Sequence, residues 1–252
     1  RLTGIKPITL RAWERRYELI EPVRTESGHR LYTQEHIDYL NQALKLMDEG
    51  IPISRVKTVL SEPPVVQMQM QPEHHQSELI QTAVRAAIDF DLAQLERCLD
   101  RLFADYSLKP LLPLLIEVDK TLSTDPQAAL ALNLWQSCLT QRIQVRLHPF
   151  QQSNRFTARR LFIHRTPHTS AWMTKFIALF CFEQGYQPFH FDKMLELESV
   201  QKLHEQLDLH GIILVDNLNS DYQEWSRFIK NFSSIKSWVL GGGDLETLEP
   251  PS

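Results

Sequence analysis

The sequence predicts a multidomain fold: a small α-helical domain with a β-hairpin, then a four-helix bundle, then an α/β domain with a doubly wound, flavodoxin-like parallel sheet. Three observations predict it. Apolar residues recur at helical spacing through most of residues 1–148, and residues 61–76, rich in proline and glutamine, interrupt them as a linker would. Beyond residue 149, short apolar runs alternate with helical segments. That alternation is typical of parallel sheets, because each crossover between parallel strands needs a covering helix.

The composition is that of a globular protein with room for several cores. The chain has 252 residues, of which 42% are hydrophobic and 23% are charged. No apolar run approaches the roughly 18 residues of a membrane span. The three cysteines, Cys98, Cys138 and Cys181, lie far apart without a CxxC pair. We therefore expect no membrane segment, and buried thiols in a reducing cytoplasm rather than a disulfide framework or a zinc site.

The charge is divided unevenly along the chain. The net charge is −4, but residues 1–32 hold seven basic and four acidic side chains, so this end carries +3 and the remaining residues carry −7. A basic end on an acidic body is typical of a nucleic-acid-binding domain joined to a separate regulatory region.

The N-terminal part predicts a small helical domain. Residues 7–17 form a helix whose apolar positions alternate with arginines; the apolar members are Ile8, Leu10, Trp13 and Tyr17. Two short extended pieces around a glycine turn predict a hairpin over residues 23–32. Thr33 is placed to cap a helix that runs to about residue 48, and a short helix follows, opened by Pro52.

These elements carry a family resemblance. The stretch TLRAWERRYELIEPVRTESGHRLYTQEHIDYL, residues 9–40, closely resembles the winged helix-turn-helix of the MerR family of bacterial regulators, and the resemblance extends over essentially all of residues 1–60. The segments TLRAWERRY, PVR and GHRLY occur in the family's order and spacing. The resemblance implies a sequence-specific, DNA-binding transcription regulator of the bacterial cytoplasm rather than an enzyme.

The resemblance also implies a mode of action and partners. A homodimer would bind a palindromic site in double-stranded promoter DNA. It would activate transcription by bending and untwisting an over-long promoter spacer, so that RNA polymerase can engage both promoter elements. Such readout depends on the deformability of the DNA as well as on base contacts.

Candidate DNA-binding residues follow from the motif and its chemistry. Three arginines project from the 7–17 helix, away from its core side, and can reach base edges or phosphates in the major groove. Hairpin residues beside the glycine turn come close to phosphate, and two tyrosines and a further arginine are phosphate neighbours or supports. The candidates are Thr9, Arg11, Arg15, Arg16, Tyr17, Arg24, His29, Arg30 and Tyr32. The alternative is a solvated face on which these arginines pair with Glu14 and Glu18.

Residues 77–148 predict a bundle of four helices with short connections. Asp91 with Gln94 resembles a capping box at the start of the second helix. The third and fourth helices are expected over about residues 109–122 and 126–147.

Residues 157–249 predict the α/β domain. Its strongest strand signal is an uninterrupted apolar run that suits a buried parallel strand. The expected strands are residues 161–164, 188–191, 211–215 and 237–240, and the expected helices are residues 171–184, 198–207 and 222–231.

The layout of the three domains resembles a subgroup of the MerR family, the CarH/LitR-type regulators whose last two domains bind cobalamin, and also the MlrA-like regulators. The cobalamin signature of that subgroup is D-x-H-x-x-G between the first strand and the first helix. Here His168 is present, but Thr166 stands in the aspartate position and Ala171 in the glycine position. An alternative alignment puts Ser170 in the histidine position. The terminal glycines fit the pattern: Gly241 and Gly242.

We therefore expect a degenerate cobalamin-binding-like domain that has lost cobalamin ligation and takes no cofactor. If cobalamin does bind, the residues involved would be His168, Ser170, Gly241 and Gly242. A domain that keeps its sheet but not its ligand signature can dimerise, bind a regulatory protein partner, or hold another small molecule. The resemblance favours the MlrA-like regulators, which act through partner proteins. The alternative is a cobalamin-dependent, light-responsive repressor of the CarH/LitR type.

Two other classes of function fit the sequence less well. An enzyme would need a nucleophile or a carboxylate pair beside its histidines, which are scattered after residue 149. Asp216 ends a predicted strand, the usual place for a ligand or catalytic group, but it stands alone. A metal-responsive regulator would need clustered ligands. The cysteines fall within helix stripes, and His74 and His75 lie in a glutamine-rich segment where histidines are more often solvated, so we expect no metal site.

Overall fold

The computed structural model divides into two compact units, Arg1–Trp135 and Gln136–Ser252. The structure describes residues 3–5, 7–61, 72–151, 159–166, 169–193, 195, 197–216 and 235–241. In this described part of the chain, no helix is both long and apolar enough to cross a membrane.

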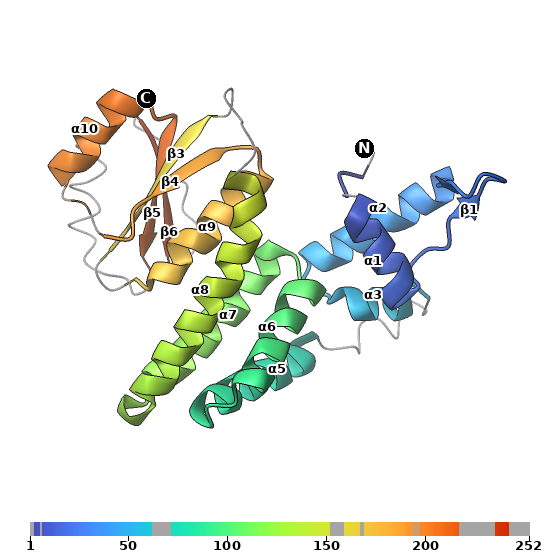
Figure 1. The fold of residues 1–252 in the computed structure, drawn as a ribbon, viewed down its shortest axis with the longest axis horizontal. Coiled ribbons are helices and arrows are strands. Elements are labelled where there is room, and N and C mark those ends of the chain that lie inside the picture. The colour runs from blue at the N-terminus through green and yellow to red at the C-terminus, as the bar shows by residue number, and fades with distance from the viewer. Residues whose placement is uncertain are drawn as a thin grey trace. The chain divides into compact units, whose positions relative to one another are not determined.

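The first unit begins with the helices and the hairpin predicted for the N-terminal part (Figure 1): α1 Pro7–Tyr17, β1 Val23–Arg24, β2 Arg30–Leu31, α2 Gln34–Asp48 and α3 Ile53–Ser61. Strands β1 and β2 pair antiparallel. Thr33 caps α2 as predicted: its side chain accepts a hydrogen bond from the backbone N–H of His36, and the His36 ring accepts one from the N–H of Thr33. Gly50 follows α2 with a φ of 92°, a conformation that glycine adopts without strain.

One apolar core holds these elements together. Its buried members come from the three helices and the turn after α1: Leu10, Trp13, Leu19, Ile20, Leu40, Ala43, Met47, Ile53 and Val56. Trp13 is buried, as predicted. Ile8, expected on the same apolar face, is 75% exposed. The prediction for Ile8 is wrong because two residues along a helix correspond to a rotation of about 200°, so that Ile8 and Leu10 lie on nearly opposite faces.

The helical region that follows starts earlier and ends later than predicted. Its elements are α5 Pro72–Ile88, α6 Leu92–Asp105, α7 Leu108–Ser123, the short 3-10 helix η1 Pro126–Ala128 and α8 Ala129–Gln151. Helix α5 begins at Pro72, inside the predicted linker, because proline is well tolerated in the first turn of a helix. Helix α8 continues through Pro149. Proline has no N–H to donate to the carbonyl four residues earlier, which is that of Val145. Val145 is 70% exposed, so water can donate a hydrogen bond to this carbonyl instead.

The packing of these helices only partly follows the predicted bundle. Helix α5 packs against both α6 and α7. Asp91 caps α6 by accepting from the N–H of Gln94, but the Gln94 side chain accepts from Arg97 instead of closing the predicted capping box. The boundary between the two units falls within α8, next to Trp135. A four-helix bundle over residues 77–148 as a separate domain stays a prediction.

The second unit contains the predicted parallel sheet. Its elements are β3 Arg160–Arg165, α9 Ala171–Glu183, β4 Gln187–His190, α10 Leu197–Leu207, β5 Gly211–Asp216 and β6 Lys236–Gly241. The strand order is β4-β3-β5-β6, with every pair parallel. The strand order therefore reverses direction between β3 and β5, as in a doubly wound fold. The predicted helix over residues 222–231 lies outside the described residues.

Both faces of this sheet are buried. On one face, Val200 of α10 packs in a cluster with Phe162 and Ile212. Leu161 and Ile163 point to the other face because side chains alternate along a strand, and both are buried. Figure 1 shows α9 and α10 beside the strands. The continuous apolar runs in the sequence are explained by this burial on two sides.

Gly211 of β5 allows close packing with β6, and its replacement tests the register. A Cβ atom at this position would clash with the Trp238 ring and lie 2.9 Å from the carbonyl oxygen of Lys236. We expect Gly211→Ala to lower the free energy of unfolding by about 1–3 kcal/mol, measured by urea denaturation. The control is Lys236→Ala, at an exposed position of β6, which we expect to change the free energy of unfolding by less than about 0.5 kcal/mol. Equal stability of Gly211→Ala and the unmodified protein would contradict the register.

Candidate functional site

Helix α1 presents a basic face to solvent. Arg11, Arg15 and Arg16 are all exposed, and Arg11 and Arg15 are four residues apart, so they share one face of the helix. Among the described residues, no carboxylate pairs with any of these three arginines. The alternative, a solvated face paired with Glu14 and Glu18, is contradicted only in the pairing of these three arginines, which are solvated as it expects.

Glu14 and Glu18 have other partners. Oε2 of Glu14 lies 2.7 Å from Nε of Arg30, and Oε1 lies 3.3 Å from Nη2 of Arg24. Glu18 lies 3.5 Å from the ammonium group of Lys57 on α3. The hydrogen bond from Arg30 holds the pKa of the Glu14 carboxyl below its ordinary value. Glu14 thus ties the hairpin to α1, and the arginines of the hairpin are held in place beside the basic face.

The tip of the hairpin is ordered by its own backbone. Gly28 has a φ of 82° and donates its N–H to the carbonyl of Thr25 at 2.8 Å. The hydroxyl of Thr25 accepts from the N–H of His29 at 3.0 Å. Glycine is the residue that adopts such a positive φ at little cost. The turn leaves the side chain of His29 exposed, beside Arg30.

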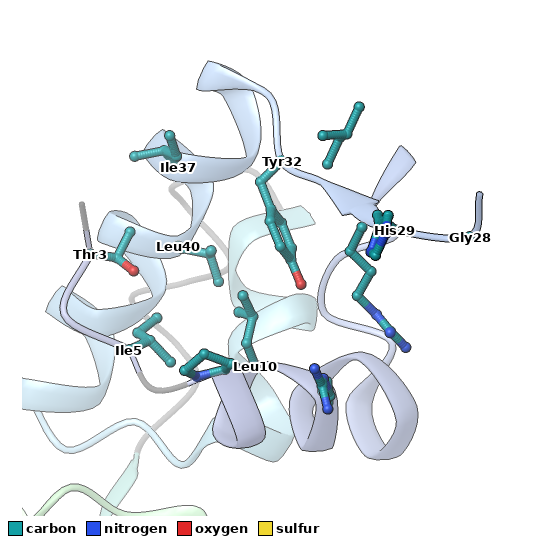
Figure 2. Close-up of a pocket in the computed structure, with 12 residues that line it drawn as sticks. Thr3, Ile5, Leu10, Gly28, His29, Tyr32, Ile37 and Leu40 are labelled. Carbon is teal, nitrogen blue, oxygen red and sulfur yellow. The ribbon is translucent and has the colours of Figure 1, made fainter. Parts of the chain in front are cut away.

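A hollow of about 540 Å³ lies between the hairpin, α1 and α2 (Figure 2). Its floor is apolar, and the labelled side chains of Leu10 and Leu40 lie there. The rings of His29 and Tyr32 line it from the hairpin side. Thr9, the remaining candidate on α1, is half-buried. The fold thus brings four candidate residues together around one hollow: Arg11, His29, Arg30 and Tyr32. Their spacing in the sequence did not require this.

Tyr17 faces the other way. Its hydroxyl lies 2.9 Å from Oδ1 of Asp105 on α6, a carboxylate that is 5% exposed. Asp105 also lies 3.6 Å from Nε of Arg101 and 3.5 Å from the hydroxyl of Ser54 on α3. Burial, and then the hydrogen bond to Asp105, raise the pKa of Tyr17 to about 12. Tyr17 was expected to be a phosphate neighbour or a support, and its hydroxyl is bonded to Asp105.

Two further contacts join the N-terminal helices to the helical region. The hydroxyl of Ser107 donates to the carbonyl of Met47 at 3.2 Å, and the side-chain amide of Gln76 donates to the carbonyl of Gly50 at 3.2 Å. Sequence reasoning missed Asp105, Ser107 and Gln76. No local signal could have revealed them, because each acts on a partner far away in the chain.

Thr166, Thr169 and Asp216 are joined by hydrogen bonds at the carboxyl edge of the sheet, where such folds take ligands. The hydroxyls of Thr166 and Thr169 lie 2.8 Å apart, and the Thr166 hydroxyl lies 3.3 Å from Oδ1 of Asp216. Thr169 donates to the carbonyl of Val215 at 3.1 Å. All three side chains are buried: Thr166 is 8%, Thr169 2% and Asp216 3% exposed. Thr166, which stands in the aspartate position of the expected cobalamin signature, is therefore part of a buried polar network.

The other candidate cofactor residues are only partly described. The hydroxyl of Ser170 accepts from the side-chain amide of Gln136 at 3.0 Å, and Gly241 pairs with Asp216 across β6 and β5. His168 and Gly242 lie outside the described residues. His75, expected to be solvated, lies in α5 with its ring 3.4 Å from Arg101. Within the described ranges, no three His, Cys, Asp or Glu side chains converge as a metal site.

Comparison with known proteins supplies the family of the N-terminal residues. Residues 1–63 match the model of the MerR HTH family regulatory protein. The HTH-type transcriptional regulator MlrA of Escherichia coli (strain K12) is 47% identical over 60 residues, which are 24% of this chain and 25% of that protein. The HTH-type transcriptional repressor CarH of Myxococcus xanthus is 42% identical over 59 residues, 23% of this chain and 20% of that protein.

The similarity has a limited extent. The chain matches a fifth to a quarter of the length of these two relatives, over the helix-turn-helix region. A solved structure, described as a novel cobalamin-binding protein from Desulfitobacterium hafniense DCB-2, is 10% identical with a TM-score of 0.32; the match covers 66% of this chain and 85% of that one.

Replacing Tyr17 tests the link to Asp105. We expect Tyr17→Phe to lower the free energy of unfolding by about 1–3 kcal/mol, because the buried carboxylate loses a donor. The difference in free energy of unfolding between Tyr17→Phe and the unmodified protein should shrink as pH rises from 10 toward 12. The pKa of Tyr17 is raised in the folded protein, so its hydroxyl stabilises the fold fully below pH 10. This stabilisation is lost as the hydroxyl of the folded protein ionises. Urea unfolding around pH 8 and around pH 11 measures both effects.

The matched control is Tyr39→Phe. Tyr39 is half-buried, and its hydroxyl makes no hydrogen bond to another described residue. Loss of the Tyr39 hydroxyl should change the free energy of unfolding by less than about 0.5 kcal/mol. Equal losses for the two variants would show that the Tyr17–Asp105 hydrogen bond contributes nothing specific.

Proposed function

We propose, from the premise that residues 1–63 form a helix-turn-helix domain of the MerR family, that the chain is a sequence-specific, DNA-binding transcription regulator of the bacterial cytoplasm and not an enzyme. In this proposal α1 is the recognition helix and the β1–β2 hairpin is the wing. The observation that carries it is that α1 exposes three arginines, two of them on one face, and that no described carboxylate pairs with them.

The chemistry of DNA supports these roles. Guanidinium groups on a helix can bond to phosphates or to guanine edges in the major groove. His29 and Arg30 lie on the wing beside the same hollow as Arg11, so they can bond to the flanking phosphates. Because Glu14 already holds Arg24 and Arg30, the wing is ordered before DNA arrives and little entropy is lost on binding.

The proposal extends to assembly and mechanism by analogy with the family. A homodimer would bind two half-sites of a palindromic promoter, and bending the over-long spacer would let RNA polymerase engage it. The domain that dimerises is then outside residues 1–63, in the helical region or in the α/β domain.

For the second unit we propose a sensory or partner-binding role without cobalamin. Three contacts of described residues support this proposal: Thr166 is bonded to Thr169 and to Asp216, and Ser170 is bonded to Gln136. A corrin tail needs open backbone at this edge, and the buried Thr166–Thr169–Asp216 network occupies it. The likeness of the N-terminal residues to the repressor CarH keeps a cobalamin-dependent repressor as the alternative.

DNA binding is tested by charge removal at one position. We expect the protein to bind a double-stranded DNA of mixed sequence with an affinity that falls as salt rises. Arg15→Ala should weaken binding about tenfold, because an Arg–phosphate or Arg–guanine contact is worth about 1–3 kcal/mol. Fluorescence anisotropy over a series of salt concentrations gives both the affinity and the salt slope.

The control for this change is Arg97→Ala, which removes the same charge from an exposed position on α6. Its affinity and salt slope should match those of the unmodified protein. If Arg97→Ala weakens binding as much as Arg15→Ala, net charge alone drives the binding and α1 is not the reading helix.

The loss of cobalamin is tested by absorption. The purified protein is incubated in the dark with adenosylcobalamin or methylcobalamin, desalted, and examined in the visible range. We expect a colourless protein, because the sheet edge is filled by its own side chains. A retained corrin band would favour the cobalamin-dependent repressor and contradict the proposed loss of ligation.

A further inference from the structure

The side chain of Ile8 is apolar but is exposed to solvent. It lies in the first turn of α1 and is 75% exposed, more than any other large apolar side chain among the described residues. The apolar core of the unit includes Leu10 and Trp13 of the same helix but not Ile8. Nothing in the packing of the described chain therefore accounts for an isoleucine at this position.

The helix places Ile8 on the basic face. At 3.6 residues per turn, Ile8 lies within about 20° of Arg15 and about 60° of Arg11 around the helix axis. Arg11 and Arg15 are exposed. One face of α1 therefore combines an apolar group in its first turn with guanidinium groups in the next two turns.

The chemistry of this face selects its ligand. A ligand of this face must offer anionic or acceptor groups to the arginines. It must also offer Ile8 an apolar group within a few ångströms of those anionic or acceptor groups. The major groove of DNA offers this combination, because thymine carries a C5-methyl group beside base acceptors and between two rows of phosphates. The N-terminal residues of a recognition helix are the ones that approach base edges.

We propose that Ile8 is a specificity-determining residue that contacts the C5-methyl group of a thymine in the DNA site. The inference rests on the proposed function, since it needs α1 to enter the major groove. Ile8 supplies sequence preference through this contact, while Arg11 and Arg15 supply affinity and register. A thymine at one position of each half-site is then preferred over the other three bases.

The test begins with a double-stranded DNA library of random sequence. The unmodified protein selects its preferred sequences over several rounds of binding, and each thymine of the selected duplex is then replaced singly by deoxyuracil, which removes only the methyl group. At one position per half-site, this replacement should weaken binding by the unmodified protein about three- to fivefold, the size expected for one methyl group withdrawn from apolar contact. For Ile8→Ala the same replacement should have no further effect.

The controls separate the two proposals. Leu130→Ala changes an apolar side chain that is 70% exposed on α8, and it should keep the full response to deoxyuracil. Because Ile8 is exposed, thermal unfolding of Ile8→Ala should match that of the unmodified protein. If no sequence is enriched, the proposed function fails, and the inference with it. If a sequence is enriched but no deoxyuracil effect depends on Ile8, the proposed function stands and this inference is wrong.

Discussion

The arrangement of the first unit depends on a buried carboxylate, that of Asp105 at the end of α6. A charge removed from water is costly unless donors surround it. Here the donors come from α1 through Tyr17, from α3 through Ser54, and from α6 itself through Arg101. Because each donor satisfies the same group, the orientations of α1, α3 and α6 are set together. Any movement of α6 would therefore also shift α1, the helix that carries the basic face.

Helix α1 serves two surfaces at once. Its inner side, with Trp13 and Tyr17, is fixed by the apolar core and by Asp105. Its outer side, with Ile8, Arg11 and Arg15, is left to solvent. Glu14 lies between the two sides and holds the hairpin arginines against the helix. The basic surface is thus assembled in the free protein, which reduces the entropy lost when a ligand binds.

The second unit combines a doubly wound parallel sheet with a buried polar network at the carboxyl edge of that sheet. The reversal of strand order between β3 and β5 creates the position where doubly wound folds bind small molecules. Thr166 and Thr169 occupy this edge and bond to one another and to strand β5. Fold alone therefore does not determine what such a domain binds, and the side chains at the edge do.

The sequence by itself determined the elements of the fold and the basic face of α1. Helix caps such as Thr33, apolar periodicity and buried strand runs are local properties, and a parallel sheet follows from their alternation. Tertiary structure alone decided which groups meet. Tyr17 and Asp105 are 88 residues apart, and nothing in either neighbourhood specifies the other. The partners of Glu14 and the exposure of Ile8 likewise depend on how helices pack, because periodicity shows that a helix has an apolar face but not where that face ends.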